Sequence, residues 1–120
     1  MRRDFGKLLR LARQQVGKSM GDVAKHLGVS VVFISDVERG NRAPLTTERI
    51  IQAAQFLGVG ALPLLKAAAE ERGAFELDAN VSKKAREVGA VLMQGWATLK
   101  DEQLEQIAKI LQDHRGNAIE

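Results

Sequence analysis

The stretch MGDVAKHLGVSVVFISDVERG, which runs from Met20 to Gly40, has the pattern of two short helices joined by a tight bend. Apolar residues repeat at the spacing of one helix face on both sides of the bend: Val23, Ala24 and Leu27 before it, and Ile34 and Val37 after it. Gly28 opens the bend, where a glycine with positive φ commonly ends a helix. Two short helices joined in this way form a helix-turn-helix.

Residues that favour helix starts flank both helices. Ser19 is suited to cap the first helix, and Asp22 stands three residues on, where a capping box needs its acidic partner. Ser30 is suited to cap the second. These signals predict a helix over Met20–Leu27 and another that begins after Ser30 and ends near Arg39.

Val31, Val32 and Phe33 stand side by side in the second of these helices, where part of the chain is expected to face outward. Aromatic residues are rare in this sequence, which has four Phe, one Trp and no Tyr. Packing in the core does not explain why the outward side of this helix carries apolar residues.

Further helices are predicted on either side of the central pair by apolar spacing and by capping residues, at Asp4–Gln15, Thr47–Leu57, about Leu62–Arg72, Lys83 to about Leu99, and after Asp101. The segment Ala74–Asp78, AFELD, alternates apolar and acidic residues and predicts a short edge strand. We therefore expect one domain over residues 1–72 and a second region over residues 73–120.

The composition is that of a globular chain, with 45% hydrophobic and 28% charged residues among 120. The sequence has no cysteine, which excludes disulfides and thiolate metal sites and is typical of a cytoplasmic protein. No apolar run has the length of a secretion signal or a membrane span. Neither a metal-ligand cluster nor a nucleophile motif is present, so we expect no cofactor, no metal and no enzymatic activity.

Charge is distributed unevenly along the chain. Through Leu45 there are nine Lys and Arg residues against four acidic ones, whereas from Thr46 onward there are nine against eleven. The N-terminal part is therefore the part suited to a polyanion.

The span from about Phe5 to Val59 resembles the Xre-type, lambda-repressor-like helix-turn-helix domain of bacterial and phage regulators. The resemblance rests on residues at the spacing of that family: Arg13, Ser19, Ala24, Gly28, Ser30, Ile34, Ser35, Glu38, Gly40, Pro44 and the sequence FLGV that closes the span. It implies an all-α fold, in which a five-helix lambda-repressor-like domain is followed by the short strand and two C-terminal helices for dimerisation. It also implies a partly buried ion pair between Arg13 and Glu38.

In such a domain the third helix lies in the major groove. The resemblance therefore implies base contacts from Ser30, Val31, Val32, Ser35 and Asp36. Exposed valines can meet thymine methyl groups, and an aspartate can accept from cytosine. Alternatives stay open for both kinds of residue: the valines could cover the helix junction, and Asp36 could be structural or could disfavour binding to wrong sequences.

Phosphate contacts are expected around the start of the second helix and the loop after the third. The candidates are Lys7, Lys18, Ser19, Met20, Arg39, Asn41 and Arg42. Many relatives of this kind carry a glutamine at the position of Met20. Met20 therefore departs from the family pattern, and its phosphate contact is the least expected of the set.

The second region carries apolar residues that a five-helix domain does not need. We expect them to form a homodimer interface, with Phe75, Leu77, Leu92, Trp96 and Leu99 as its candidates and with Ala74–Asp78 pairing edge to edge across a two-fold axis. The alternative is that these helices fold back on their own domain. A two-fold dimer would read an inverted repeat in double-stranded DNA, with half-sites roughly 34 Å apart.

The sequence thus predicts a sequence-specific DNA-binding transcriptional regulator, a homodimeric repressor from a phage, a mobile element or a small operon. Two other functions remain open. One is an antitoxin-type autorepressor whose C-terminal region binds a toxin, and the other is a protein-only adaptor on the same fold.

Overall fold

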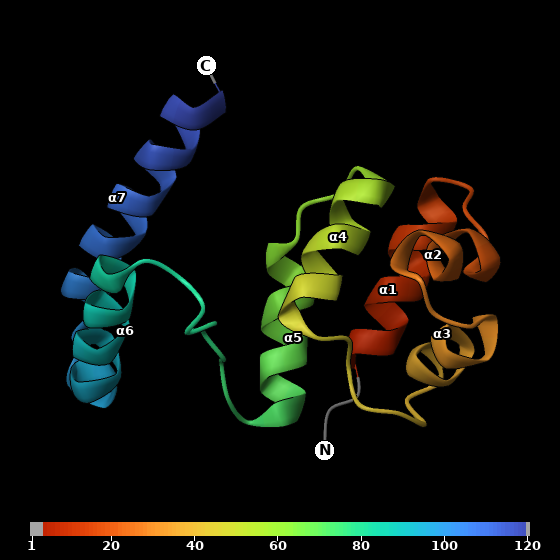
Figure 1. The fold of residues 1–120 in the computed structure, drawn as a ribbon, viewed down its shortest axis with the longest axis horizontal. Helices are drawn as coiled ribbons and strands as arrows, with labels where there is room; N and C mark the ends of the chain where they lie inside the picture. The colour runs from red at the N-terminus through yellow and green to blue at the C-terminus, as the bar shows by residue number, and fades with distance from the viewer. Residues whose placement is uncertain (1–3, 120) are drawn as a thin grey trace. The chain divides into compact units, whose positions relative to one another are not determined.

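The computed structural model describes residues 4–119, and side chains over residues 4–113. The chain forms two compact units, Met1–Glu76 (unit 1) and Leu77–Glu120 (unit 2). The described residues are helical with connecting loops and include no β-strand (Figure 1). The all-α class predicted from the sequence is therefore confirmed.

Unit 1 contains α1 (Asp4–Gln15), α2 (Met20–Leu27), α3 (Val31–Glu38), α4 (Thr47–Leu57) and α5 (Leu62–Arg72). These bounds agree with the ranges predicted from apolar spacing and caps. Helix α2 packs against α3 and α4, while α1 lies between α3 and α5 (Figure 1). The largest fully buried side chains come from all these helices except α5, and from the loop before α4: Phe5, Leu9, Val23, Ile34, Val37, Leu45 and Ile50. The helix-turn-helix is thus one side of a single aliphatic core.

The helix ends follow from local chemistry. Ser19 accepts from the backbone N–H of Asp22 and forms the expected capping box, and Ser30 accepts from the N–H of Phe33. Gly28 has a φ of 70°, in the left-handed region that favours glycine. Its backbone N–H is directed at the last carbonyls of α2, which ends that helix and turns the chain into α3. These three predictions are confirmed.

Helices α1 and α3 approach each other at Gly6. A Cβ atom there would lie 2.5 Å from the carbonyl oxygen of Val37 and 2.8 Å from the carbonyl carbon of Glu38, and it would overlap the Glu38 carbonyl oxygen. Only glycine leaves room for this backbone contact. The last turn of α3 therefore rests directly on the first turn of α1.

The loop between α3 and α4 is tied to the end of α5. The Arg72 guanidinium donates to the backbone carbonyls of Pro44 and Leu45. Leu45 is itself almost fully buried. The loop is therefore held at its C-terminal end, close to the start of α4.

Unit 2 contains α6 (Lys83–Gly95), a 3₁₀ turn η1 (Trp96–Thr98) and α7 (Asp101–Ile119). The helix predicted to reach Leu99 ends at Gly95 instead. The Thr98 hydroxyl donates to the Gly95 carbonyl at 2.9 Å, and Leu99 is extended with ψ of 132°. Gly95 is a poor helix former, and the chain tightens there into the 3₁₀ turn before it becomes extended at Leu99.

The strand predicted at Ala74–Asp78 is wrong, because residues 75–78 have no regular secondary structure. A strand needs a hydrogen-bonded neighbour, and the part of the chain that the structure describes offers none. The alternation of Phe75 and Leu77 with acidic residues leaves both apolar side chains largely exposed.

Unit 2 has no core of its own among its described side chains. Every side chain from residue 77 to residue 113 is at least partly exposed. Large apolar side chains are exposed on both of its helices: Val88, Val91, Met93, Ile107, Ile110 and Leu111. Folding gains little when apolar surface stays in water, so α6 and α7 need a further surface to cover them.

Candidate nucleic-acid interface

Helix α3 has an inner and an outer side. Ile34 and Val37 are buried against α1 and α2, which confirms that they close the helix onto the core. On the outer side Val31 is 48% exposed and Val32 is 67% exposed. Val31 lies near α2, because a Cβ on Gly21 would be 3.9 Å from its Cγ2 atom. Val32 is therefore the more available of the two valines for an external contact.

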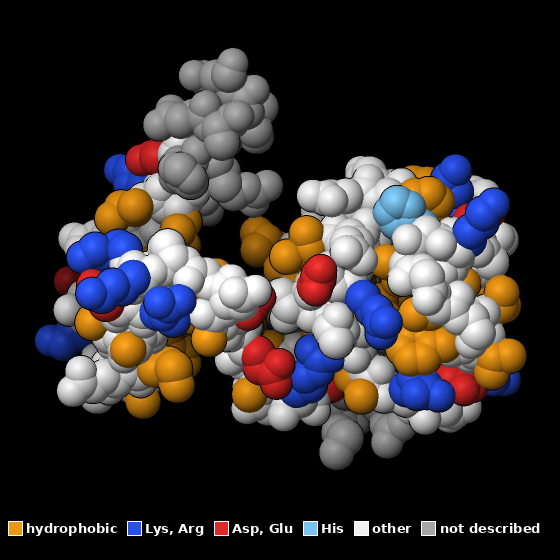
Figure 2. All heavy atoms as spheres, in the orientation of Figure 1, with side chains coloured by type: hydrophobic (Ala, Val, Ile, Leu, Met, Phe, Trp, Pro, Cys, Tyr) orange, Lys and Arg blue, Asp and Glu red, His pale blue; other side chains and the backbone are white. Residues whose placement is uncertain are grey.

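Phe33 lies between these two sides. It packs partly against the core, while its ring carries two arginine side chains from other segments. The Cζ atom of Arg42 is 4.7 Å from the ring centroid, and that of Arg49 is 5.6 Å from it. Figure 2 shows hydrophobic side chains over α3 with Lys and Arg side chains beside them. The adjacent apolar residues of α3 thus have different environments: Val32 is exposed, Val31 is half-exposed and Phe33 is covered by arginines.

Asp36 and Arg39, predicted for different contacts, form a pair with each other. An Arg39 Nη2 donates to Asp36 Oδ1 at 3.1 Å, one helical turn apart. The Arg39 side chain is 64% exposed, so the pair is held loosely and can open toward another ligand. Ser35 is half-buried on the same helix.

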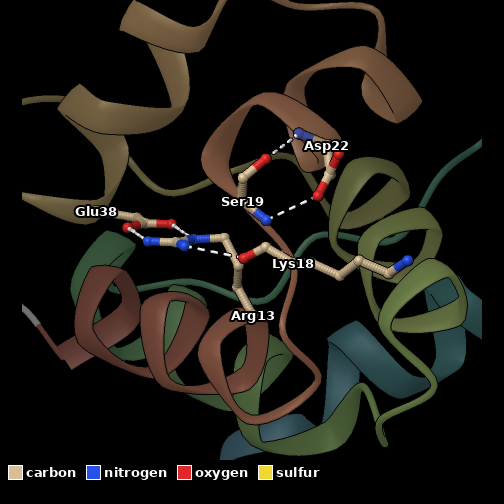
Figure 3. Close-up of polar contacts among 5 residues, drawn as sticks. All are labelled: Arg13, Lys18, Ser19, Asp22 and Glu38. Atoms are coloured by element: carbon tan, nitrogen blue, oxygen red, sulfur yellow. Dashed lines mark hydrogen bonds and ion pairs between the residues drawn. The ribbon is translucent and has the colours of Figure 1, made fainter.

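Arg13 and Glu38 form the ion pair that the resemblance implied, which is confirmed (Figure 3). Arg13 Nε donates to Oε2 at 2.7 Å and Nη2 donates to Oε1 at 2.8 Å, while Nη1 donates to the Lys18 carbonyl at 3.0 Å. Glu38 raises the pKa of Arg13 by accepting these bonds, so the guanidinium stays charged. One side chain therefore joins α1, the segment before α2 and the end of α3.

The capping box at the start of α2 is exposed to solvent (Figure 3). The Asp22 carboxylate accepts from the Ser19 backbone N–H at 2.8 Å. This bond favours the ionised form and lowers the pKa of Asp22, and the Ser19 side chain contributes in the same direction. The box fixes the orientation of the α2 N-terminus, which is the expected phosphate-binding end.

This lowered pKa predicts how acid affects stability. A carboxyl group whose pKa is lower in the folded state contributes stability above its unfolded pKa of about 4, and that contribution is lost as pH falls through the folded pKa. We expect Asp22→Asn to lower the free energy of unfolding at pH 6, with the gap to wild type closing as pH falls below about 4. Urea unfolding of both proteins across this range measures the gap. A gap that does not change with pH would contradict the assignment.

The other candidates for phosphate contact are placed differently. Lys7 is exposed on α1, and Asn41 is exposed in the loop, where its backbone N–H donates to the Asp36 carbonyl. The Lys18 ammonium lies 5.3 Å from the centroid of the Phe56 ring. Met20 packs against the core. The candidates are thus spread over α1, the start of α2 and the loop, and Met20 contributes chiefly to packing.

Arg49 is the residue that the sequence did not single out. It lies on the first turn of α4 and reaches Phe33, sixteen positions earlier in the chain. Periodicity within one helix carries no information on such a contact. The only available signal was a basic residue close to a helix start that follows a basic loop.

The described residues meet neither the requirements of a metal site nor those of a membrane-spanning helix. Over the range whose side chains are placed, no three His, Cys, Asp or Glu side chains converge as metal ligands. His26 stacks on Phe56 with ring centroids 4.4 Å apart. Of the helices in the described part of the chain, none combines the length and the apolar character that crossing a bilayer requires.

Comparison with known proteins identifies a family for the chain. A family model described as a helix-turn-helix domain matches residues 4–68, which are more than half of the chain and include all of α1–α4. No curated protein matches the sequence.

Proposed function

Because the chain belongs to the helix-turn-helix domain family, we propose that it is a sequence-specific DNA-binding transcriptional regulator of the Xre type, with unit 1 as its lambda-repressor-like DNA-binding domain. In this proposal α3 enters the major groove, and Ser30, Val31 and Val32 meet base edges there. Phosphates are bound by the N-terminus of α2 and by the loop after α3. The protein acts in the cytoplasm as a repressor, without a cofactor or a catalytic step.

The observation that carries the proposal is the outer side of α3. It presents exposed valines in a helix whose inner side is fixed by Ile34 and Val37, and the basic Arg42 lies beside it. Apolar groups flanked by guanidinium groups suit the methyl groups of thymine between two phosphate backbones.

The proposal includes a homodimer formed through unit 2. Its support is the absence of buried side chains among residues 77–113 together with the exposed apolar residues of α6 and α7. The charges of the two helices are compatible with pairing between copies: α6 begins with Lys83, Lys84 and Arg86, of which Lys84 pairs with Glu87, while α7 begins with Asp101, Glu102 and Glu105. A two-fold axis that brings α6 of one copy to α7 of the other would match these charges.

Titration of duplex DNA at two salt concentrations tests the proposed function. We expect the affinity for any duplex to fall steeply between about 50 and 200 mM salt, with a log–log slope of about −0.9 for each phosphate neutralised. A labelled duplex from the region preceding the gene is expected to bind more tightly than a random duplex of equal length. Fluorescence anisotropy measures both affinities.

A substitution on α3 separates base reading from backbone binding. Val32→Ala is expected to weaken binding to the preferred duplex by on the order of 1 kcal/mol and to leave the affinity for random DNA unchanged. Salt-independent binding, or no binding at all, would reject DNA as the ligand and favour the adaptor function.

Sedimentation equilibrium tests the dimer. Wild-type protein is expected at twice the 13.1 kDa mass of one chain, whereas Trp96→Glu is expected to shift it toward the monomer because it places a charge in the apolar face. Ala90→Glu is the matched control, since position 90 lies on the opposite side of α6 from Leu92. A monomeric wild-type protein would favour a different partner for unit 2, such as a toxin.

A further inference from the structure

Phe33 is the meeting point of two cationic side chains that are distant in the sequence. Arg42 comes from the loop after α3 and Arg49 from the first turn of α4, and their Cζ atoms lie 4.7 and 5.6 Å from the centre of the ring. Both distances are within the roughly 6 Å range of a cation–π interaction. The same ring therefore contacts two positive charges that come from different segments of the chain.

These two guanidinium groups keep their donors available. Within residues 4–113, neither Arg42 nor Arg49 forms a side-chain hydrogen bond or an ion pair. Three other arginines of unit 1, Arg13, Arg39 and Arg72, donate to protein oxygens. Arg10 is also without a hydrogen bond or ion pair within the described residues, but unlike Arg42 and Arg49 it is not held against a ring. Two oriented cations without an anion on the protein are arranged to receive one from outside.

A guanidinium stacked on a ring loses less conformational freedom when it binds than one that moves freely in solvent. Its planar N–H groups fit the oxygens of a phosphate in a two-point contact. The position also suits DNA, since Phe33 is on α3 directly after the exposed Val31 and Val32. A strand whose bases meet these valines would have its backbone beside the arginines.

We infer that Phe33, Arg42 and Arg49 form a phosphate clamp for the DNA backbone. In this clamp Arg42 and Arg49 are the phosphate ligands, and Phe33 is a positioning residue that orders both of them. The inference rests on the proposed function and extends it to Arg49, a DNA ligand on α4, and to a role for Phe33 beyond packing.

The clamp is tested by DNA titration at two salt concentrations with substituted full-length protein. Arg42→Ala and Arg49→Ala are each expected to lower the affinity for random duplex about fivefold and to reduce the salt slope by about 0.9. Phe33→Leu keeps an apolar side chain but removes the ring, and it is expected to lower the affinity as well. Phe33→Tyr keeps the ring and is expected to bind like wild type.

A triple substitution tests the positioning role of Phe33. If the ring acts through the arginines, adding Phe33→Leu to a protein that already carries Arg42→Ala and Arg49→Ala causes no further loss of affinity. Lys66→Ala on α5 is the charge-matched control, because α5 packs on the side of α1 away from α3 (Figure 1). Thermal unfolding of each variant identifies losses that come from stability alone.

The outcomes separate the clamp from the proposed function. If wild-type protein shows no salt-dependent DNA binding, the proposed function itself is rejected. If wild type binds but Arg49→Ala behaves like Lys66→Ala, the clamp is overturned while DNA binding stands. An additive loss from Phe33→Leu in the protein without both arginines would overturn its positioning role. Should Phe33→Leu reduce the folded fraction, Phe33→Tyr and the arginine variants still decide.

Discussion

Gly6→Ala is expected to destabilise unit 1 by about 1–3 kcal/mol or more, although alanine is the better helix former by about 1 kcal/mol. The added methyl group would overlap the Glu38 carbonyl oxygen and lie 2.5 Å from that of Val37. Both atoms belong to the backbone of α3, which cannot yield by changing a rotamer. The helices would have to separate, and the contact between the first turn of α1 and the last turn of α3 would be lost. The free energy of unfolding in urea measures the effect.

Gly21→Ala is the matched control for this substitution. Gly21 is also within a helix of unit 1, but an added Cβ would meet only side-chain atoms at ordinary distances, Ser19 Oγ at 3.5 Å and Val31 Cγ2 at 3.9 Å. We expect its stability to be unchanged or raised by up to about 1 kcal/mol. Equal effects of the two substitutions would show that the α1–α3 contact does not limit stability.

Arg13→Ala is expected to cost about 3 kcal/mol, because it leaves the Glu38 carboxylate without its cation in a site that is only 5% exposed. The loss includes three hydrogen bonds, two to Glu38 and one to the Lys18 carbonyl. Since Glu38 ends α3 and Lys18 precedes α2, both parts of the helix-turn-helix are expected to loosen together. Chemical unfolding gives the energy, and amide exchange in α3 locates the change.

Two comparisons identify burial as the cause of this cost. Arg39→Ala removes an arginine–carboxylate pair of similar type whose arginine is 64% exposed, and it is expected to cost less than about 1 kcal/mol. Replacing both Arg13 and Glu38 with apolar residues is expected to restore much of the stability lost in Arg13→Ala. If the double substitution is as unstable as the single one, the unpaired carboxylate is not the source of the loss.

The helices of unit 1 were predictable because their signals are local. Ser19, Asp22 and Ser30 act on backbone groups within the next turn, and Gly28 acts on the turn before it. Such contacts depend on a few neighbouring residues and are encoded in short patterns. The inner side of α3 followed from spacing in the same way, since Ile34 and Val37 are one turn apart.

Contacts between distant segments were not predictable from spacing. Nothing in the sequence near Gly6 indicates that two carbonyl groups of α3 will lie against it. The pairing of Arg13 with Glu38 came from the resemblance to a family and not from periodicity. Neither periodicity nor the family resemblance predicted that Arg49 would lie against Phe33. This contact is known only from the structure.

Unit 2 shows where local patterns mislead. The alternation of apolar and acidic residues around Phe75 and Leu77 indicated a strand. Alternation shows only that one face of an extended segment would be apolar, and it does not provide a second strand for backbone hydrogen bonds. The helix expected to reach Leu99 kept its apolar spacing through Trp96 but ended at Gly95. Spacing alone does not mark a helix end, and Gly95 is the poor helix former at which α6 stops.

The residues that hold α3 in place are different from the residues that α3 exposes to solvent. Gly6, Ile34, Val37 and the Arg13–Glu38 pair hold the helix, whereas Val32 is two-thirds exposed and contributes little to folding. Substitutions on the exposed side of α3 can therefore change its surface chemistry while the buried contacts that hold the helix persist. In the proposed function, a single substitution at such a position would change the preferred DNA target at little cost in stability.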